Sequence, residues 1–122
     1  MLKVEQEQTT EACTICRPVG ELDAFTVGHF REALAELASK PRLIIDMSGV
    51  SFIDSAGLGA LIGGIRRTRE LGGEVVVCCN RPSIVRTLQT TGFDRIVTMT
   101  ETVGEAKAVL GKSGQAGTAD EK

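Results

Sequence analysis

The chain has 122 residues, of which 42% are hydrophobic and 25% charged, the length and composition of one globular domain with a single core. A net charge of −2, with four Phe and neither Tyr nor Trp, excludes the basic, aromatic surface that nucleic-acid binding requires. The longest stretch with few charges, residues 47–65, is interrupted by Asp54, serines and glycines, and the first residues are polar. We therefore predict neither a membrane span nor a signal peptide, and expect a cytoplasmic protein.

Two candidate strands, residues 3–7 and 12–18, come first in the chain. The polar residues 8–11 between them favour a turn. The two strands are therefore predicted to form an antiparallel hairpin, with the first strand at the edge of a sheet.

The first helix follows the sequence Gly20-Glu21-Leu22-Asp23. Either Asp23 or Thr26 is predicted to cap this helix, and residues 39–41 are predicted to end it. Its inward side is formed by apolar residues at helical spacing, namely Val27, Phe30, Leu34 and Leu37.

The central stretch, residues 43–67, joins a buried strand to a second helix. Its first three residues, Leu43-Ile44-Ile45, are a continuous apolar run typical of a strand buried on both faces. The Asp54-Ser55 pair that follows is an N-cap signal, with Ser55 either as a plain cap or as a functional hydroxyl among unpaired backbone N–H groups. Such a helix start stabilises a phosphate. The inward residues of the helix are Leu58, Leu61, Ile62 and Ile65.

Gly72-Gly73 is predicted to end the second helix, and residues 74–79 form another buried strand. Pro82 begins a short third helix after Asn80-Arg81, and residues 95–99 form a further strand.

Thr102 and Glu105 predict a capping box for a last helix, in which Ala106 and Leu110 point inward. The sequence is small and polar from Gly111 onward. We therefore expect one domain of residues 1–110 followed by a disordered tail of residues 111–122.

Strands that alternate with helices predict right-handed βαβ crossovers. The expected fold is α/β, with a mixed, mostly parallel sheet, about four helices and the N-terminal hairpin. Strand-to-helix loops of such a sheet gather at its carboxyl edge, where α/β proteins bind their partners. The loops predicted to share this edge are residues 20–23, 48–55, 80–81 and 100–101.

Cys13 and Cys16 have the C-x-x-C spacing of redox and zinc sites. Residues three apart in a strand face opposite sides of the sheet, however, and the adjacent Cys78 and Cys79 diverge likewise. We interpret the four cysteines as reduced, apolar side chains, and expect neither a metal nor a cofactor.

Two enzyme classes match the sequence poorly. Gly57, Gly59 and Gly63 depart from the spacing of the dinucleotide fingerprint, and too little chain follows for that fold. Ser55 lacks the G-x-S-x-G surroundings of a nucleophile, and the only histidine, His29, lies on the first helix. No enzymatic activity is expected.

Two features of the second helix stay open. Gly57, Gly59, Gly63 and Gly64 each disfavour a helix by about 1 kcal/mol relative to Ala, which indicates close approach by a neighbouring helix or by a partner. The charged side chains on the outer side of the second helix are either a solvated face or a partner-binding patch, and they are Arg66, Arg67, Arg69 and Glu70.

Two longer motifs stand at the expected edge. The first is Gly20-Glu21-Leu22-Asp23-x-x-Thr26, and the second is Asp46-x-Ser48-x-Val50-x-Phe52-x-Asp54-Ser55-x-Gly57-Leu58-Gly59. Shorter matches follow at Gly72-Gly73-Glu74 and Thr91-Gly92. In these motifs, over about residues 10–110, the chain resembles the STAS-domain family of anti-sigma factor antagonists.

The resemblance implies that Ser55 is phosphorylated by a partner that is both anti-sigma factor and serine kinase. In this family the unphosphorylated antagonist binds the kinase and frees the sigma factor, phosphorylation releases it, and a phosphoserine phosphatase resets the switch. A STAS scaffold or sensor-complex subunit that does not act on such a kinase is the alternative. The residues expected to face the partner are Gly20, Glu21, Asp23, Asp54, Ser55, Gly57, Leu58, Gly59, Asn80 and Arg81.

Overall fold

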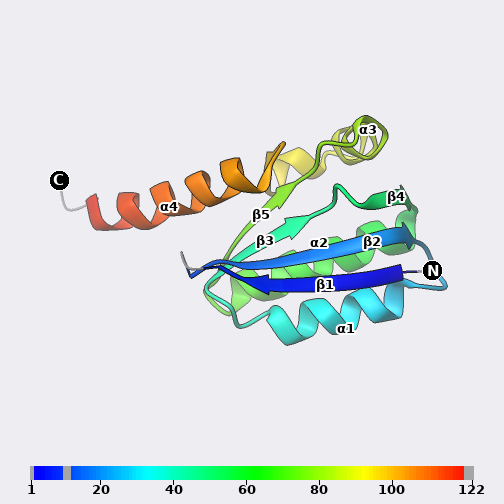
Figure 1. The fold of residues 1–122 in the computed structure, drawn as a ribbon, viewed down its shortest axis with the longest axis horizontal. Helices are drawn as coiled ribbons and strands as arrows, with labels where there is room; N and C mark the ends of the chain where they lie inside the picture. The colour runs from blue at the N-terminus through cyan, green and yellow to red at the C-terminus, as the bar shows by residue number, and fades with distance from the viewer. Residues whose placement is uncertain (1, 10–11, 120–122) are drawn as a thin grey trace.

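A computed structural model of the protein describes residues 2–9 and 12–119. Within these residues, strands and helices alternate after an initial hairpin, except that β4 directly follows β3 (Figure 1). Their bounds are β1 Leu2–Gln8, β2 Thr14–Leu22, α1 Val27–Leu37, β3 Arg42–Asp46, β4 Val50–Ile53, α2 Ser55–Glu70, β5 Glu74–Cys78, α3 Pro82–Thr90, the 3₁₀ helix η1 Phe93–Arg95, β6 Thr98–Thr100 and α4 Val103–Ala119.

The strands form one mixed sheet in the order β1-β2-β3-β5-β6, and β4 pairs with β2. β1 and β2 are antiparallel, from Leu2 opposite Gly20 to Gln8 opposite Thr14. The other described pairs are parallel. This arrangement confirms the predicted α/β fold with its N-terminal hairpin and mostly parallel sheet. The turn predicted at residues 8–11 includes residues 10 and 11, which lie outside the described residues.

β2 is longer than the sequence predicted, and β4 was not predicted. Gly20, Glu21 and Leu22 were expected in a loop, but they continue β2 and pair with β4. A bulge lies at Gly20 and Glu21, where Gly20 has a φ of +122°, which favours glycine. β4 is buried at Val50 and Ile53 and exposed between them, so it lacks the two-residue alternation that identifies a half-buried strand.

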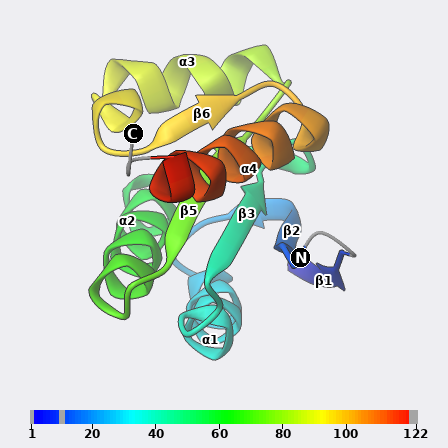
Figure 2. The ribbon, with the colours of Figure 1, turned by 90° about the vertical axis from the view of Figure 1, so that its left-hand side faces the viewer.

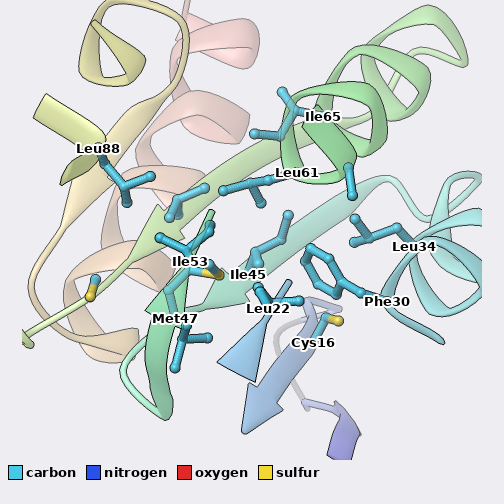
Figure 3. Packing of buried hydrophobic residues seen from close by; sticks show 14 of the residues in the cluster. Cys16, Leu22, Phe30, Leu34, Ile45, Met47, Ile53, Leu61, Ile65 and Leu88 are labelled. Atoms are coloured by element: carbon cyan, nitrogen blue, oxygen red, sulfur yellow. The ribbon is translucent and has the colours of Figure 1, made fainter. Parts of the chain in front are cut away.

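Helices cover both faces of the sheet. α1, α2 and α3 contribute to the larger core on one face, whereas α4 packs against β3, β5 and β6 on the other (Figure 2). Figure 3 shows how Phe30 and Leu34 of α1 and Leu61 and Ile65 of α2 meet around Ile45 of β3. The apolar spacings read from the sequence therefore face the core as predicted.

The four cysteines divide between the two cores. Cys16 and Cys79 lie in the larger core and Cys13 and Cys78 in the smaller, so each pair faces opposite sides of the sheet as predicted. All four are buried, and none of the four forms a disulfide. Burial raises the pKa of Cys16 to about 12, and burial together with the nearby Asp46 carboxylate raises that of Cys78 to about 12. These two thiols are therefore protonated at neutral pH.

The predicted capping box forms at the start of α4. The Thr102 hydroxyl accepts a hydrogen bond from the Glu105 N–H at 3.1 Å. The Glu105 carboxylate accepts one from the Glu101 N–H at 2.9 Å, one residue before the usual donor. Ala106 and Leu110 are buried, as their spacing predicted.

The C-terminal elements differ from their predicted bounds. Gly92, with a φ of +78°, leads into η1, so the strand predicted at residues 95–99 begins only at Thr98. α4 continues to Ala119, whereas the sequence predicted a disordered tail from residue 111. No proline interrupts residues 111–119, and glycine disfavours a helix without preventing it. No helix in the described ranges is long and apolar enough to cross a membrane.

Candidate functional site

Ser55 is the first residue of α2, and its side chain is exposed. The N-cap is Asp54, whose Oδ1 accepts a hydrogen bond from the Gly57 N–H at 3.0 Å. Ser55 is therefore not the cap, because it is Asp54 that has the extended backbone that an N-cap adopts, with φ −110° and ψ −171°. In the described part of the chain, no hydrogen bond occupies the Ser55 hydroxyl.

The start of α2 is attached directly to β2. The Asp54 N–H donates to the Leu22 carbonyl oxygen at 3.1 Å, and Leu22 lies opposite Ile53 in the parallel pair of β2 and β4. A Cβ at Gly57 would lie 2.7 Å from the same oxygen, so a larger residue would displace the backbone. Gly57 is buried, and it lets α2 approach β2 instead of facing a partner as predicted.

The glycines of α2 fall into two pairs. Gly57 and Gly64 lie where a neighbouring element comes close, and a Cβ at Gly64 would lie 2.5 Å from Leu34 Cδ1 of α1. Gly59 and Gly63 are exposed, and a Cβ at either would have nothing within 4 Å. Packing within the fold thus accounts for the first pair, whereas Gly59 is exposed to solvent next to a half-buried Leu58.

Asp23 and Thr26 hold the turn between β2 and α1. The Asp23 Oδ1 accepts hydrogen bonds from the N–H groups of Phe25 at 2.9 Å and Thr26 at 3.1 Å. The Thr26 hydroxyl accepts from the Asp23 N–H at 3.1 Å and donates to the Glu21 carbonyl oxygen at 2.7 Å. Thr26 is the N-cap of α1 but its side chain makes no cap hydrogen bond. Thr26 is thus at the N-cap position, as one of the two predicted alternatives had it, but the side chains of both residues stabilise the preceding turn.

Asn80 and Arg81 gather around Ser48. The Asn80 N–H donates to the Ser48 hydroxyl at 3.2 Å, and the Arg81 Nε donates to the Ser48 carbonyl oxygen at 3.3 Å. Asn80 also lines an open groove of about 940 Å³ beside Val85 of α3 and Glu105 of α4. These residues form a group at the ends of β3 and β5.

The strands do not all end at the same level along the predicted carboxyl edge. The residues predicted to gather there therefore form two separate groups instead of one. β2 leaves β3 after Cys16 and continues beside β4 to Leu22, about 20 Å of strand. Asp23, Asp54 and Ser55 lie beyond that point. No hydrogen bond or ion pair between described residues joins them to the group around Ser48.

The charges around Ser55 have opposite effects on an added anion. The N–H groups of Ser55 and Ala56 belong to the first turn of α2 and have no acceptor inside the helix, so they attract negative charge. Asp54 directly precedes Ser55, and Asp23 follows Leu22, whose carbonyl oxygen accepts the Asp54 N–H, so two carboxylates add negative charge near the same helix start. A phosphate on Ser55 would be tolerated by the helix and would add to the surface charge.

Phe25 was not singled out from the sequence. It lies in the turn between Asp23 and Thr26, and its side chain is 96% exposed. An aromatic residue inside a polar turn, outside the spacing of the inward residues of α1, is the signal that would have identified it.

A family model of the STAS domain matches residues 4–106. The chain is also 32% identical to the anti-sigma-B factor antagonist of Listeria monocytogenes over 88 residues, which cover 70% of this chain and 77% of that protein. The chain belongs to the STAS-domain family of anti-sigma factor antagonists.

Solved structures have the same fold as this STAS domain. An anti-sigma factor antagonist from Mycobacterium paratuberculosis superposes with a TM-score of 0.82 at 24% identity, over 89% of this chain and 93% of that chain. The Bacillus cell fate determinant SpoIIAA in its phosphorylated form superposes with a TM-score of 0.66 at 22% identity, over 88% and 99%. Within this STAS domain, the two sequence motifs meet where Asp54 N–H binds the Leu22 carbonyl.

Proposed function

We propose that this STAS domain is an anti-sigma factor antagonist that binds a serine-kinase anti-sigma factor and so frees the sigma factor. Phosphorylation of Ser55 by that kinase switches the binding off, and a phosphoserine phosphatase restores it. The protein acts by binding and carries out no catalysis of its own. The names of the relatives support the antagonist role, and the existence of a phosphorylated form of SpoIIAA supports a phosphate switch.

The observation that most supports this proposal is the accessibility of the Ser55 hydroxyl. This hydroxyl is exposed at the first position of α2, and Asp54 supplies the cap. A kinase would therefore reach the oxygen without breaking a structural hydrogen bond. The residue is expendable for the fold, as a reversible modification site requires.

Phosphorylation of Ser55 should weaken binding because the added charge is stabilised in the free protein but not in the complex. A phosphoserine adds about −1.5 to −2 charges, which the start of α2 tolerates in the free protein. In a complex fitted to a hydroxyl, the same charge would be desolvated beside the carboxylates of Asp23 and Asp54. A penalty of only about 2.7 kcal/mol weakens binding roughly a hundredfold.

Phosphosite mapping tests the proposal directly. The protein is incubated with candidate anti-sigma serine kinases and ATP, and the product is sequenced by tandem mass spectrometry. We expect one phosphate, on Ser55. The matched control is Ser51→Ala, since Ser51 is also exposed and lies on β4 just before the site. This variant should be modified like the wild type, whereas Ser55→Ala should take no phosphate.

Binding measurements with the same kinase test the switch. Ser55→Ala should bind as the unphosphorylated wild type does and stay bound in the presence of ATP, and Ser55→Asp should bind more weakly. Failure of Ser55→Ala to bind a kinase that captures the wild type would contradict the proposal. A wild type that no anti-sigma kinase modifies would favour the scaffold alternative.

A further inference from the structure

Phe25 differs from the other exposed apolar side chains of the described residues. Its side chain is 96% exposed, whereas the remaining large exposed apolar residues, which include Leu71 and Phe52, are 39–51% exposed. Partly packed apolar residues on a surface are ordinary. A phenyl ring with almost no contact in its own fold contributes nothing to the core, so its contribution lies in what it meets outside.

The backbone that carries this ring is held in place. The Phe25 N–H donates to the Asp23 Oδ1 at 2.9 Å, and the Thr26 hydroxyl links the Asp23 N–H to the Glu21 carbonyl oxygen. Fixing the backbone that carries a side chain before the encounter reduces the ordering entropy that binding must overcome. Asp23 is therefore a positioning residue for Phe25.

The turn that carries Phe25 also begins next to the proposed switch. Leu22 accepts the hydrogen bond from the Asp54 N–H, and Phe25 follows Leu22 by three residues, at most about 10 Å of chain. In Figure 1 the end of β2 and the start of α2 lie at the same end of the molecule. A protein that covers Ser55 would therefore reach Phe25 as well.

We propose that Phe25 is the apolar anchor of the interface with the anti-sigma kinase, an inference that rests on the proposed function. The ring enters an apolar pocket of the kinase, and basic side chains around that pocket face the carboxylates of Glu21, Asp23 and Asp54. Aromatic anchors surrounded by polar contacts dominate the energetics of many interfaces. Phe25 contributes to the free energy of binding, and the phosphorylation state of Ser55 determines whether the complex forms.

Titration of variants against the kinase that modifies Ser55 tests the anchor. Phe25→Ala should weaken binding at least tenfold without changing the melting temperature, because the ring makes almost no contact in the free protein. The matched control is Leu71→Ala, a 51% exposed residue at the far end of α2, about 24 Å along the helix from Ser55. This control should bind within twofold of the wild type.

A single tryptophan gives a second, spectroscopic readout. The chain has no Trp, so Phe25→Trp places one reporter at the proposed anchor. Its emission should move to shorter wavelength when the kinase is added, relative to kinase with wild-type protein, and Leu71→Trp should show no such shift.

The outcomes separate the anchor from the switch. Wild-type affinity for Phe25→Ala, or an unshifted emission from the Phe25→Trp variant in a saturated complex, would overturn the anchor while normal phosphorylation of Ser55 left the proposed function standing. A wild type that neither binds nor is modified would overturn both.

Discussion

Alanine at Gly57 and at Gly59, two residues apart on α2, should change the stability of the protein in opposite directions. Alanine favours a helix over glycine by about 1 kcal/mol. A Cβ at Gly59 would meet nothing within 4 Å, so Gly59→Ala should gain that amount. At Gly57 the Cβ would lie 2.7 Å from the Leu22 carbonyl oxygen and 2.9 Å from Ile53 Cγ1. Overpacking against backbone costs about 3 kcal/mol, so Gly57→Ala should lose about 2 kcal/mol net.

Thermal unfolding followed by calorimetry or circular dichroism measures both changes. The entropy of unfolding is about 2.1 cal/mol/K per residue, or about 0.26 kcal/mol/K for 122 residues. Gly59→Ala should therefore raise the melting temperature by about 4 °C, and Gly57→Ala should lower it by about 8 °C. Shifts of similar size in the same direction would refute the reasoning, because helix propensity alone would then determine both.

Three further predictions concern caps, thiols and the C-terminus. Asp54→Ala should lower the free energy of unfolding in urea by about 1 kcal/mol and Ser55→Ala by less than about 0.5 kcal/mol, because Asp54 makes the cap hydrogen bond; equal losses would contradict this assignment. Cys16 and Cys78, whose pKa values are raised to about 12, should resist iodoacetamide at pH 8 in the native protein and react once it is unfolded. Because the unfolded chain ionises these thiols near their ordinary pKa of 9.0, stability should be insensitive to them below about pH 9 and fall as the pH rises toward 12; native labelling as fast as unfolded labelling would count against their burial. Deletion of residues 111–122 should change stability by less than about 0.5 kcal/mol, since the buried side chains described for α4 all precede residue 111, and a large drop in melting temperature would show otherwise.

Patterns that repeat along the chain predicted the fold well. The apolar run at Leu43-Ile44-Ile45 became β3, and the helical spacing of Leu61 and Ile65 placed both residues in the core. The alternation of Cys13 and Cys16 across the sheet also followed from strand geometry alone. Each of these inferences depends only on the residue spacing within a single helix or strand. This spacing can be read directly from the sequence.

Features that depend on contact between distant segments were not predicted. β4 forms because β2 extends past β3 and pairs with residues 50–53. The sequence of these four residues does not by itself indicate this pairing. Likewise, Gly57 is required by the carbonyl of Leu22, and Asp54 rather than Ser55 became the cap where that carbonyl fixes the chain. The motifs identified the family correctly, but the separate structural roles of Asp54, Ser55 and Gly57 depend on tertiary contacts.

The opposite placement of the two ends of the chain makes them unequal points of attachment. β1 begins opposite Gly20, close to the end of β2 that carries Asp23, whereas α4 leads away toward the other end of the molecule (Figure 1). A tag, surface or further domain joined ahead of β1 would crowd the serine and compete sterically with a partner. The same addition after α4 would leave the serine open. Binding experiments should therefore immobilise the protein through the α4 end. A segment added before β1 would sterically hinder access of a partner to Ser55.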